Sequence, residues 1–198
     1  MTGDDLIKEI KLIFKTDWKK REGRKIPDTE DVKLGNDAVN IDGTVLYADL
    51  TDSTGLVNNY KSWFAAEVYK AYLVGACRVI KDNSGEITAF DGDRVMAIFI
   101  GERKNTNAAK TALKINYIVG EINKLIKQSY PSTSYELSQK IGIDTSKLFV
   151  AKTGIRNSND LVWVGRAANY AAKLSSLENC YQHTFITTVF LIYQLRVI

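Results

Sequence analysis

Two short acidic motifs, each placed where a strand ends or turns, constrain this 198-residue chain most strongly. In the first, TVLYADLTDSTG (residues 44–55), an apolar run with strand character ends at Asp49. In the second, AFDGDRVMAIFIG (residues 89–101), Asp93 lies at the turn of an expected hairpin. Two carboxylates at the mouth of one sheet would bind a divalent metal, and a turn that leads into a helix offers backbone N–H groups to phosphate. Together these features indicate nucleotide chemistry.

The rest of the hydrophobic pattern predicts strands alternating with helices. We expect helices at about 4–20, 54–81, 105–127 and 166–177, and strands at 45–50, 86–90, 95–100, 139–144, 147–153 and 184–188. This order is typical of an α+β sandwich, a ferredoxin-like or palm fold with a mainly antiparallel sheet and helices on one face. The length suits one such domain, at 41–198, preceded by an amphipathic helix and lead-in at 1–40.

Composition and charge exclude several other classes of protein. The formal net charge is only +4 and charges of both signs are mixed, which is too mild to indicate nucleic-acid binding. The basic run KKREGRK (residues 19–25) is better explained as a solvated helix end than as a membrane or nucleic-acid contact. No apolar run reaches the about 20 residues that a membrane span needs, and the first residues lack the apolar core of a secretion signal. We therefore expect a cytoplasmic protein with neither a membrane nor a nucleic-acid partner.

Three motifs taken together resemble the catalytic domain of the class III nucleotidyl cyclases. YADLTDST, FDGDRVMAIF and VGRAANYAAKL occur in the order and approximate spacing of that family, over roughly residues 40–190. With RKIPD and DLVWVG added, the chain more closely resembles the bacterial pyrimidine cyclases of Pycsar anti-phage systems. The resemblance implies an enzyme that converts UTP or CTP to the 3′,5′-cyclic monophosphate and pyrophosphate. Its product would be a second messenger that signals to a separate effector in anti-phage defence.

The same resemblance implies a site for two metal ions, Mn²⁺ or Mg²⁺. Their ligands would be Asp49, Asp93 and the backbone carbonyl of Leu50. Backbone N–H groups of the turn after the first strand would hold the β- and γ-phosphates, namely those of Thr51, Asp52, Ser53, Thr54 and Gly55. The Asp52 side chain itself fits a turn or helix cap better than a metal ligand.

The late helix carries the residues that would steady the transition state. The family has an asparagine there, followed four residues later by an arginine, and these positions are Asn169 and Lys173 in this chain. Lysine keeps the charge but loses the two-pronged geometry of a guanidinium. Arg166 offers a second cation. Because the acids and this helix belong to opposite halves, the family builds its site across a head-to-tail dimer, and we expect a homodimer with two sites.

The positions that select a purine in adenylate cyclases depart from that pattern. Ala89 and Val162 stand where adenylate cyclases have a lysine and an aspartate. Tyr47 and Arg94, beside the metal aspartates, are better placed to read a pyrimidine, because they donate to carbonyl oxygens and a bulky ring shrinks the pocket. Trp163 is equally suited to stacking on a base or to a core position.

Three alternatives remain open. The first is a catalytically silent cyclase-like module that binds nucleotide or only dimerises, which the lysine at 173 and a domain cut short at its C-terminus would favour. The second is a purine cyclase, or a dinucleotide-forming palm enzyme, whose Gly-Gly-acid-acid-Phe hairpin FDGDRV does not match. The third is a basic RNA-binding domain, which the core periodicity of the aromatic residues argues against.

Overall fold

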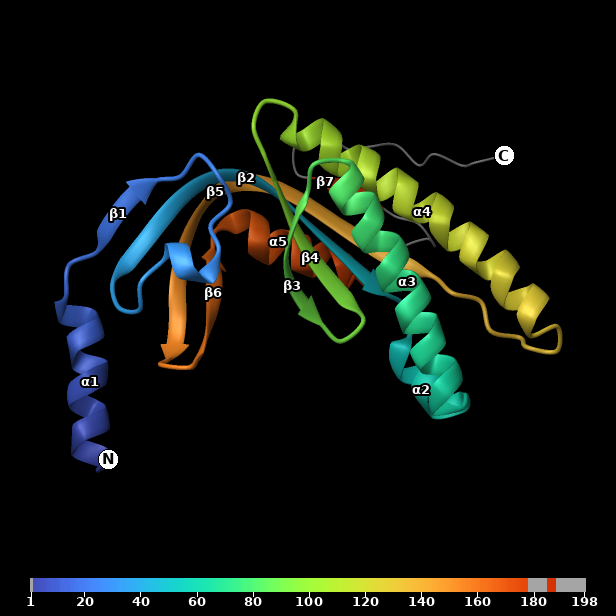
Figure 1. Cartoon of the computed structure of the whole chain (residues 1–198), viewed down its shortest axis with the longest axis horizontal. Helices are drawn as coiled ribbons and strands as arrows, with labels where there is room; N and C mark the ends of the chain where they lie inside the picture. Colours follow the sequence, from blue (N-terminus) through green and yellow to red (C-terminus); the bar gives the residue numbers. More distant parts are fainter. Residues whose placement is uncertain (1, 178–184, 188–198) are drawn as a thin grey trace. The chain divides into compact units, whose positions relative to one another are not determined.

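The computed structural model describes residues 2–177 and 185–187 (Figure 1). Its elements in chain order are α1 (Gly3–Lys15), β1 (Lys19–Glu22), the 3-10 turn η1 (Thr29–Asp31), β2 (Asp37–Leu50), α2 (Ser53–Asn59), α3 (Ser62–Asp82), β3 (Glu86–Asp91), β4 (Arg94–Ile100), α4 (Lys104–Ser129), β5 (Gln139–Ile155), β6 (Ser158–Val164), α5 (Arg166–Ser175) and β7 (Phe185–Thr187). The strands hydrogen-bond in the order β3-β4-β2-β5-β6, with β1 also paired to β2 and β7 to β5. Among the described residues, no helix is long and apolar enough to span a membrane.

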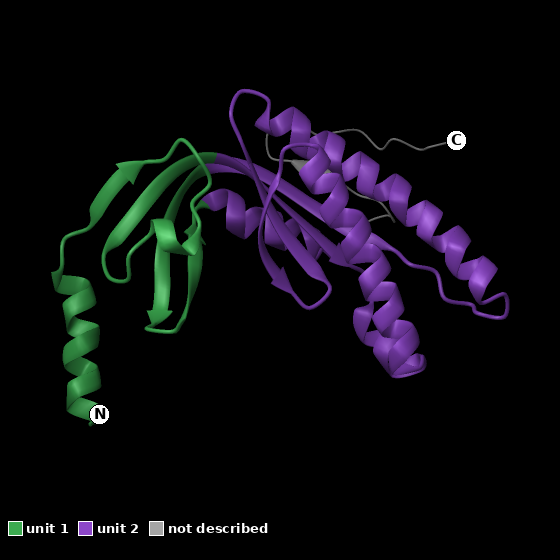
Figure 2. Ribbon diagram, in the orientation of Figure 1, with its two compact units in different colours: residues 1–42, 147–165 green, residues 43–146, 166–198 purple. Residues whose placement is uncertain are grey.

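Packing divides the chain into two compact units (Figure 2). Unit 1 comprises residues 1–42 and 147–165, and unit 2 comprises residues 43–146 and 166–198. The long strands β2 and β5 each run through both units. The expected catalytic domain at 41–198 therefore contributes to both, and its boundary stays a prediction, as does a truncation at the C-terminus, which lies outside the described residues.

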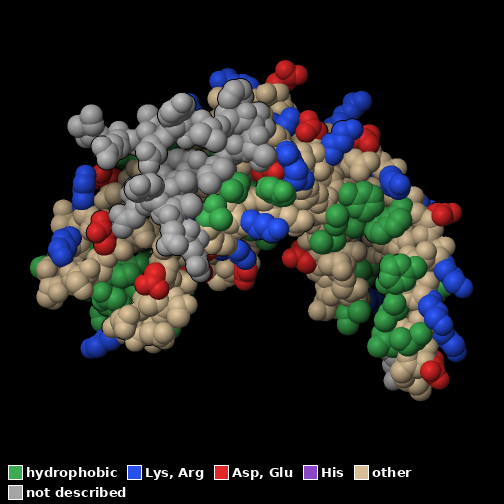
Figure 3. Space-filling model, turned by 180° about the vertical axis from the view of Figure 1, so that it is seen from behind, with side chains coloured by type: hydrophobic (Ala, Val, Ile, Leu, Met, Phe, Trp, Pro, Cys, Tyr) green, Lys and Arg blue, Asp and Glu red, His purple; other side chains and the backbone are tan. Residues whose placement is uncertain are grey.

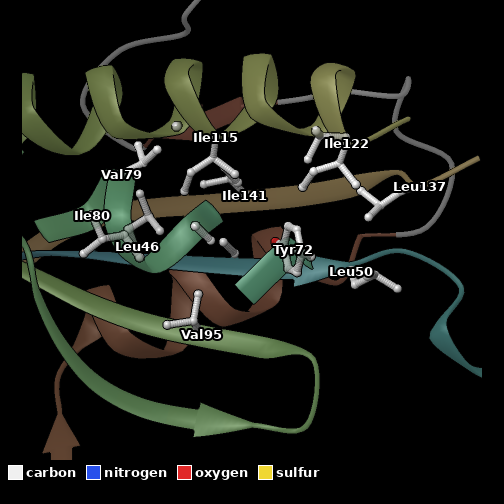
Figure 4. Close-up of a cluster of buried hydrophobic side chains, with 14 of the residues drawn as sticks. Leu46, Leu50, Tyr72, Val79, Ile80, Val95, Ile115, Ile122, Leu137 and Ile141 are labelled. Carbon is white, nitrogen blue, oxygen red and sulfur yellow. The ribbon is translucent and has the colours of Figure 1, made fainter. Parts of the chain in front are cut away.

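In unit 2, helices α3 and α4 cover one face of the sheet, and their contact with it forms the main core (Figure 4). Alternate residues of β2 point into this core, namely Leu46, Ala48 and Leu50. Alternate residues of β4 do the same, namely Val95, Ala97 and Phe99. Because successive side chains of a strand point to opposite faces, the residues between them face away from the helices. The α+β class with a mainly antiparallel sheet is confirmed.

Helix α5 lies on the opposite face of the sheet from α3 and α4. Ile141 and Ile143 of β5 belong to the core, so Gly142 between them faces the other way. A Cβ atom at Gly142 would lie 1.9 Å from the carbonyl oxygen of Ala171 in α5. The missing side chain is what lets α5 pack directly on β5. The expectation of helices on one face therefore holds for α3 and α4 and is wrong for α5.

In unit 1, the first helix is shorter than its apolar pattern predicts. It ends at Lys15, because Thr16 is extended and its hydroxyl donates to the Leu12 carbonyl at 2.7 Å. Residues 19–22, expected as a helix end, instead form β1, which pairs with β2 in parallel. None of the residues of α1 is buried, so its apolar stripe is exposed in this structure.

Two other elements differ from their predictions in unit 2. The helix expected at 54–81 breaks between α2 and α3, because Tyr60 takes an extended backbone conformation and its ring packs 5.3 Å from that of Tyr135. The two strands expected at 139–144 and 147–153 are one continuous strand, β5. The Thr145 expected at their turn instead donates its hydroxyl to the Gly43 carbonyl at 3.2 Å. Tertiary contacts decide both the break between α2 and α3 and the continuity of β5, so the apolar periodicity of the sequence does not predict either.

Candidate active site

The structure brings the two acidic residues together at one end of the sheet in unit 2. Asp49 follows Ala48, which pairs with Val95 of β4. Asp93 lies in the tight turn between β3 and β4 and precedes that strand. The register of a single pair of strands therefore places both carboxylates at the same strand end. Their charges interact, since Asp93 is one cause of the raised pKa of Asp49.

The electrostatics of these carboxylates suit a cation. Burial raises the pKa of Asp49 to about 6, the positive charge of Arg94 opposes that rise, and the charges of Asp93 and Asp91 add to it. Asp93 Oδ2 is buried and has no hydrogen-bond partner among the described residues. Uncompensated buried oxygens are uncommon in folded proteins and often mark an ion site. Leu50 ends β2 at the same strand end, with its side chain in the core.

The turn after β2 holds fewer free N–H groups than its sequence predicts. The Thr51 N–H donates to the Ser138 carbonyl at 2.9 Å. The Gly55 N–H donates to Asp52 Oδ1 at 3.1 Å, and Asp52 caps α2 from a left-handed conformation with φ of 55°. The interpretation of Asp52 as a helix cap is confirmed. The N–H groups of Thr51 and Gly55 already donate to other groups of the protein. Ser53 and Thr54 begin α2, where the N–H groups of a helix have no intrahelical partner, so phosphate binding by this turn stays a prediction for Asp52, Ser53 and Thr54.

Tyr47 and Arg94 lie together on the face of the sheet that also carries Asp49. The Arg94 guanidinium carbon lies 5.3 Å from the centre of the Tyr47 ring. Its Nη2 forms an ion pair with Asp91 Oδ2 at 2.7 Å. Sequence reasoning explained Asp91 only as a turn former and missed this ion pair, which depends on how the hairpin closes. Two groups able to read a base are thus next to the acid pair.

The late helix exposes all three of its expected residues, but they differ in their partners. Asn169 and Lys173 are exposed one turn apart on α5, and Lys173 Nζ lies 5.9 Å from the centre of the Tyr170 ring. Arg166 instead donates to the Thr145 carbonyl at 2.8 Å and to Asp144 Oδ1 at 3.3 Å, which ties the start of α5 to β5. Its expected role as a second cation of the site stays a prediction.

Among the described residues, no hydrogen bond or ion pair is seen between the exposed side of α5 and the acid pair, Asp49 and Asp93. Trp163 lies in β6 of unit 1, opposite Val150, and is only 9% exposed, which favours the core alternative for this residue over base stacking.

Sequence reasoning did not single out Tyr72, a buried tyrosine of α3. Apolar periodicity assigned it to the inner stripe of a helix, and it is indeed 1% exposed. Burial raises its pKa well above the ordinary value, and the charges of Asp49 and Asp93 raise it further. Tyr72 differs from the other core residues of α3 only in its hydroxyl group. No feature of the sequence shows the surroundings of that hydroxyl.

Replacing Asp49 by asparagine should stabilise the metal-free protein at neutral pH. The pKa of Asp49 in the folded protein is about 6, above its ordinary value of 3.8. The free energy of unfolding therefore falls as the pH rises from about 3.8 to about 6. Above that range, the ionised carboxylate still destabilises the folded protein. After discounting for partial exposure, Asp49→Asn should add about 1–2 kcal/mol to the free energy of unfolding at pH 7.5. Urea unfolding in a chelator, compared between pH 7.5 and pH 4.5, checks this. A gain that does not shrink at the lower pH would contradict it.

Comparison with known proteins agrees with this geometry. No protein-family profile matches the chain. It is 54% identical to a uridylate cyclase of Xanthomonas perforans over 186 residues, which cover 93% of this chain and 80% of that protein. It is 49% identical to a uridylate cyclase of Burkholderia cepacia over 177 residues, which cover 88% of this chain and 77% of that protein.

Solved structures show the same fold at lower identity. A class III adenylyl cyclase-like ATP-binding protein from Pseudomonas aeruginosa aligns with a TM-score of 0.72 at 19% identity, covering 94% of this chain and 41% of that one. A guanylyl cyclase aligns with a TM-score of 0.63 at 20% identity, covering 69% of this chain and 70% of that one. The chain therefore belongs to the uridylate cyclase family and is a nucleotidyl cyclase with the class III fold.

Proposed function

We propose that this nucleotidyl cyclase acts on a pyrimidine, converting UTP to 3′,5′-cyclic UMP and pyrophosphate. The ribose 3′-oxygen would form a bond to the α-phosphorus, and the bond to the β-phosphate oxygen would break. The observation that carries the proposal is the grouping of Asp49, Asp93, Tyr47 and Arg94 at one strand end. It joins a metal-binding acid pair to groups that read a base.

Class III cyclases generally depend on divalent metal ions, and the residues here fit that requirement. Asp49, Asp93 and the Leu50 carbonyl would hold two Mn²⁺ or Mg²⁺ ions, since the partnerless Asp93 oxygen needs a counter-charge. Such ions lower the pKa of an attacking hydroxyl and neutralise phosphate charge. The N–H groups of Ser53 and Thr54 would hold the terminal phosphates.

Tyr47 and Arg94 would select the base. The guanidinium already lies over the phenol ring and is paired to Asp91, so it is held in place before substrate binds. Its N–H groups donate to the carbonyl oxygens that uracil presents, whereas adenine offers no carbonyl. The names of the relatives favour UTP over CTP, which the residues alone do not separate. Replacing Tyr47 or Arg94 by alanine should change the base preference.

The active form would be a homodimer with two sites, each completed by Asn169 and Lys173 of the second copy. These side chains would meet the charge that develops at the α-phosphate. The cyclic nucleotide would act in the cytoplasm on a separate effector and contribute to anti-phage defence, as the resemblance to Pycsar cyclases implies.

A catalytically silent nucleotide-binding module is the second candidate. A cyclase-like ATP-binding protein is among the structural neighbours, and Lys173 replaces the arginine expected at its position. Such a module would bind a nucleoside triphosphate and release no cyclic product.

A product assay tests the proposal and separates the two candidates. Purified protein is incubated with Mn²⁺ and each of the four ribonucleoside triphosphates, and products are identified by mass. We expect cyclic UMP from UTP, with at least about tenfold less product from ATP and GTP, because adenine leaves the donors of the pocket unpaired and the bulky Tyr47 ring narrows the pocket against both purines. Triphosphate binding without any cyclic product would favour the silent module.

A further inference from the structure

Three consecutive residues of β5 hold the first turn of α5. The Arg166 guanidinium forms an ion pair with Asp144 Oδ1 at 3.3 Å and donates to the Thr145 carbonyl at 2.8 Å. The Ser146 hydroxyl accepts a hydrogen bond from the Ala167 N–H at 3.0 Å. All of these residues belong to unit 2. The start of α5 is therefore attached to the sheet by directional bonds at defined positions of one strand.

The rest of α5 meets the sheet through small side chains. Its buried residues are Ala167, Ala168, Ala171 and Ser175, and Gly142 of β5 lets its backbone come close. A methyl group has no preferred direction of contact, so this face packs closely without fixing how the helix is rotated about its axis. Hydrogen bonds and ion pairs are directional. The bonds at the first turn are therefore what fix that rotation.

The Asp144 carboxylate is a costly choice if stability were its only role. Its side chain is 0% exposed, whereas that of Arg166 is 49% exposed. Removing a carboxylate from water costs free energy that one ion pair often fails to return, so apolar residues in place of such a pair frequently leave stability unchanged or raise it. The best-attested use of a buried ion pair is to fix one arrangement of packed elements. Here that arrangement is the one of α5 on β5.

The rotation of α5 decides where its exposed residues point. Arg166, Asn169 and Lys173 are all exposed. They are spaced by three and four residues, so they follow one another along one side of the helix. A bond that holds the first residue of this row therefore also sets the direction of the other two.

We propose that Asp144 is a positioning residue for the cyclase reaction. Its ion pair with Arg166 fixes the rotation of α5 and so holds Asn169 and Lys173 in the direction that the α-phosphate of a bound triphosphate requires. The inference rests on the roles of Asn169 and Lys173 in the proposed function. It assigns Asp144, which lies outside the three motifs, and it gives Arg166 an indirect role in place of contact with phosphate.

The first test measures kcat and KM for UTP in Asp144→Asn, which removes the charge with little change of shape. Because Asn169 and Lys173 meet charge that develops only in the transition state, kcat should fall about 10–100-fold while KM changes less than about threefold. An unchanged kcat would overturn the proposal.

The double variant Asp144→Asn/Arg166→Gln should lose no more kcat than either single variant, because both residues act through one pair. It leaves no unpaired charge, so it should fold even if a single variant does not. A loss in Arg166→Gln, or in the double variant if Asp144→Asn does not fold, at least about tenfold beyond the 10–100-fold range would mean that Arg166 acts on the phosphate directly. That result would also overturn the proposal.

Asn83→Ala is the matched control for loss of stability. Asn83 is 8% exposed, its Nδ2 donates to the Val79 carbonyl at 2.6 Å, and it precedes β3 at the end opposite the β3–β4 turn. Its replacement should lower the midpoint of thermal unfolding and leave kcat within about twofold of wild type. An equal fall in kcat in Asn83→Ala and Asp144→Asn would mean that stability alone explains the effect of Asp144.

Mixing experiments decide which half of the site Asp144 serves. In the proposed dimer each site takes its acids from one copy and α5 from the other. Asp144→Asn unfolded and refolded together with Asp93→Asn should therefore reach about a quarter of wild-type activity, whereas with Lys173→Ala it should not rise above its own residual level. Recovery with Lys173→Ala instead would mean that Asp144 acts on the acids of its own copy, and recovery with neither would mean general damage. Either result overturns the proposal.

The mixture of Asp93→Asn with Lys173→Ala is the reference for these experiments. If that mixture does not recover, the shared sites of the proposed function are wrong, and the kcat and KM of the single and double variants still test Asp144. If it recovers and Asp144→Asn behaves otherwise than stated, only the role of Asp144 is overturned.

Discussion

Neither Asp93→Asn nor Lys173→Ala should make cyclic nucleotide alone, but the two proteins mixed should recover about a quarter of wild-type activity. Asp93→Asn removes a metal ligand worth several kcal/mol in the transition state, so its activity should fall at least about 1000-fold. In a twofold dimer whose sites each take acids from one copy and α5 from the other, a mixed dimer keeps one intact site. Random exchange makes about half of the dimers mixed, which gives the quarter.

The complementation experiment measures cyclic product after the two variants are unfolded together and refolded, with each variant treated alone as reference. No recovery in a sample that contains mixed dimers would mean that each chain supplies its own Lys173 to its own acid pair. Asp91→Asn is the matched control on the same hairpin. Its carboxylate is 77% exposed and its ion pair with Arg94 lies at the surface, so Asp91→Asn should lose no more than about fivefold in activity.

Gly142→Ala should strongly destabilise the protein. The new Cβ would meet the Ala171 carbonyl oxygen at 1.9 Å and the Ser175 nitrogen at 2.7 Å. Both are backbone atoms of α5, so no side-chain rotation relieves the clash and the helix must move. We expect the free energy of unfolding to fall by at least about 3 kcal/mol, with activity lost as Asn169 and Lys173 shift.

Gly120→Ala provides the matched control for that substitution. Gly120 lies within α4, and a Cβ there meets nothing within 4 Å. Alanine in a helix interior should stabilise by about 0.5–1 kcal/mol. Urea unfolding of both variants, with cyclase activity measured in parallel, checks the pair. A Gly142→Ala protein as stable as Gly120→Ala would mean that α5 does not pack on β5 as the structure shows.

Local sequence determined the acid pair and the elements around it. The Asp-Gly hairpin predicts β3 and β4 because such turns have few alternatives, whereas the register shift between Ile87 and Ala89 is not predicted by the turn. The same logic located Asp49 at the end of an apolar strand. The helices expected near α3, α4 and α5 were recognised from periodicity, although the break between α2 and α3 was not.

Tertiary structure decided what periodicity does not encode. The Thr51 N–H donates a hydrogen bond to Ser138, a residue 87 positions away, and Arg166 donates one to Thr145 of β5. The donors that stay free in the site therefore differ from those that its motifs predict. Gly142 sets the face on which α5 lies, and burial leaves the Tyr72 hydroxyl without a hydrogen-bond partner among the described residues. A sequence thus determines which chemical groups are present and which local turns present them. Which of those groups stay free to act depends on distant backbone atoms, because hydrogen-bond partners and burial arise only when the chain has folded.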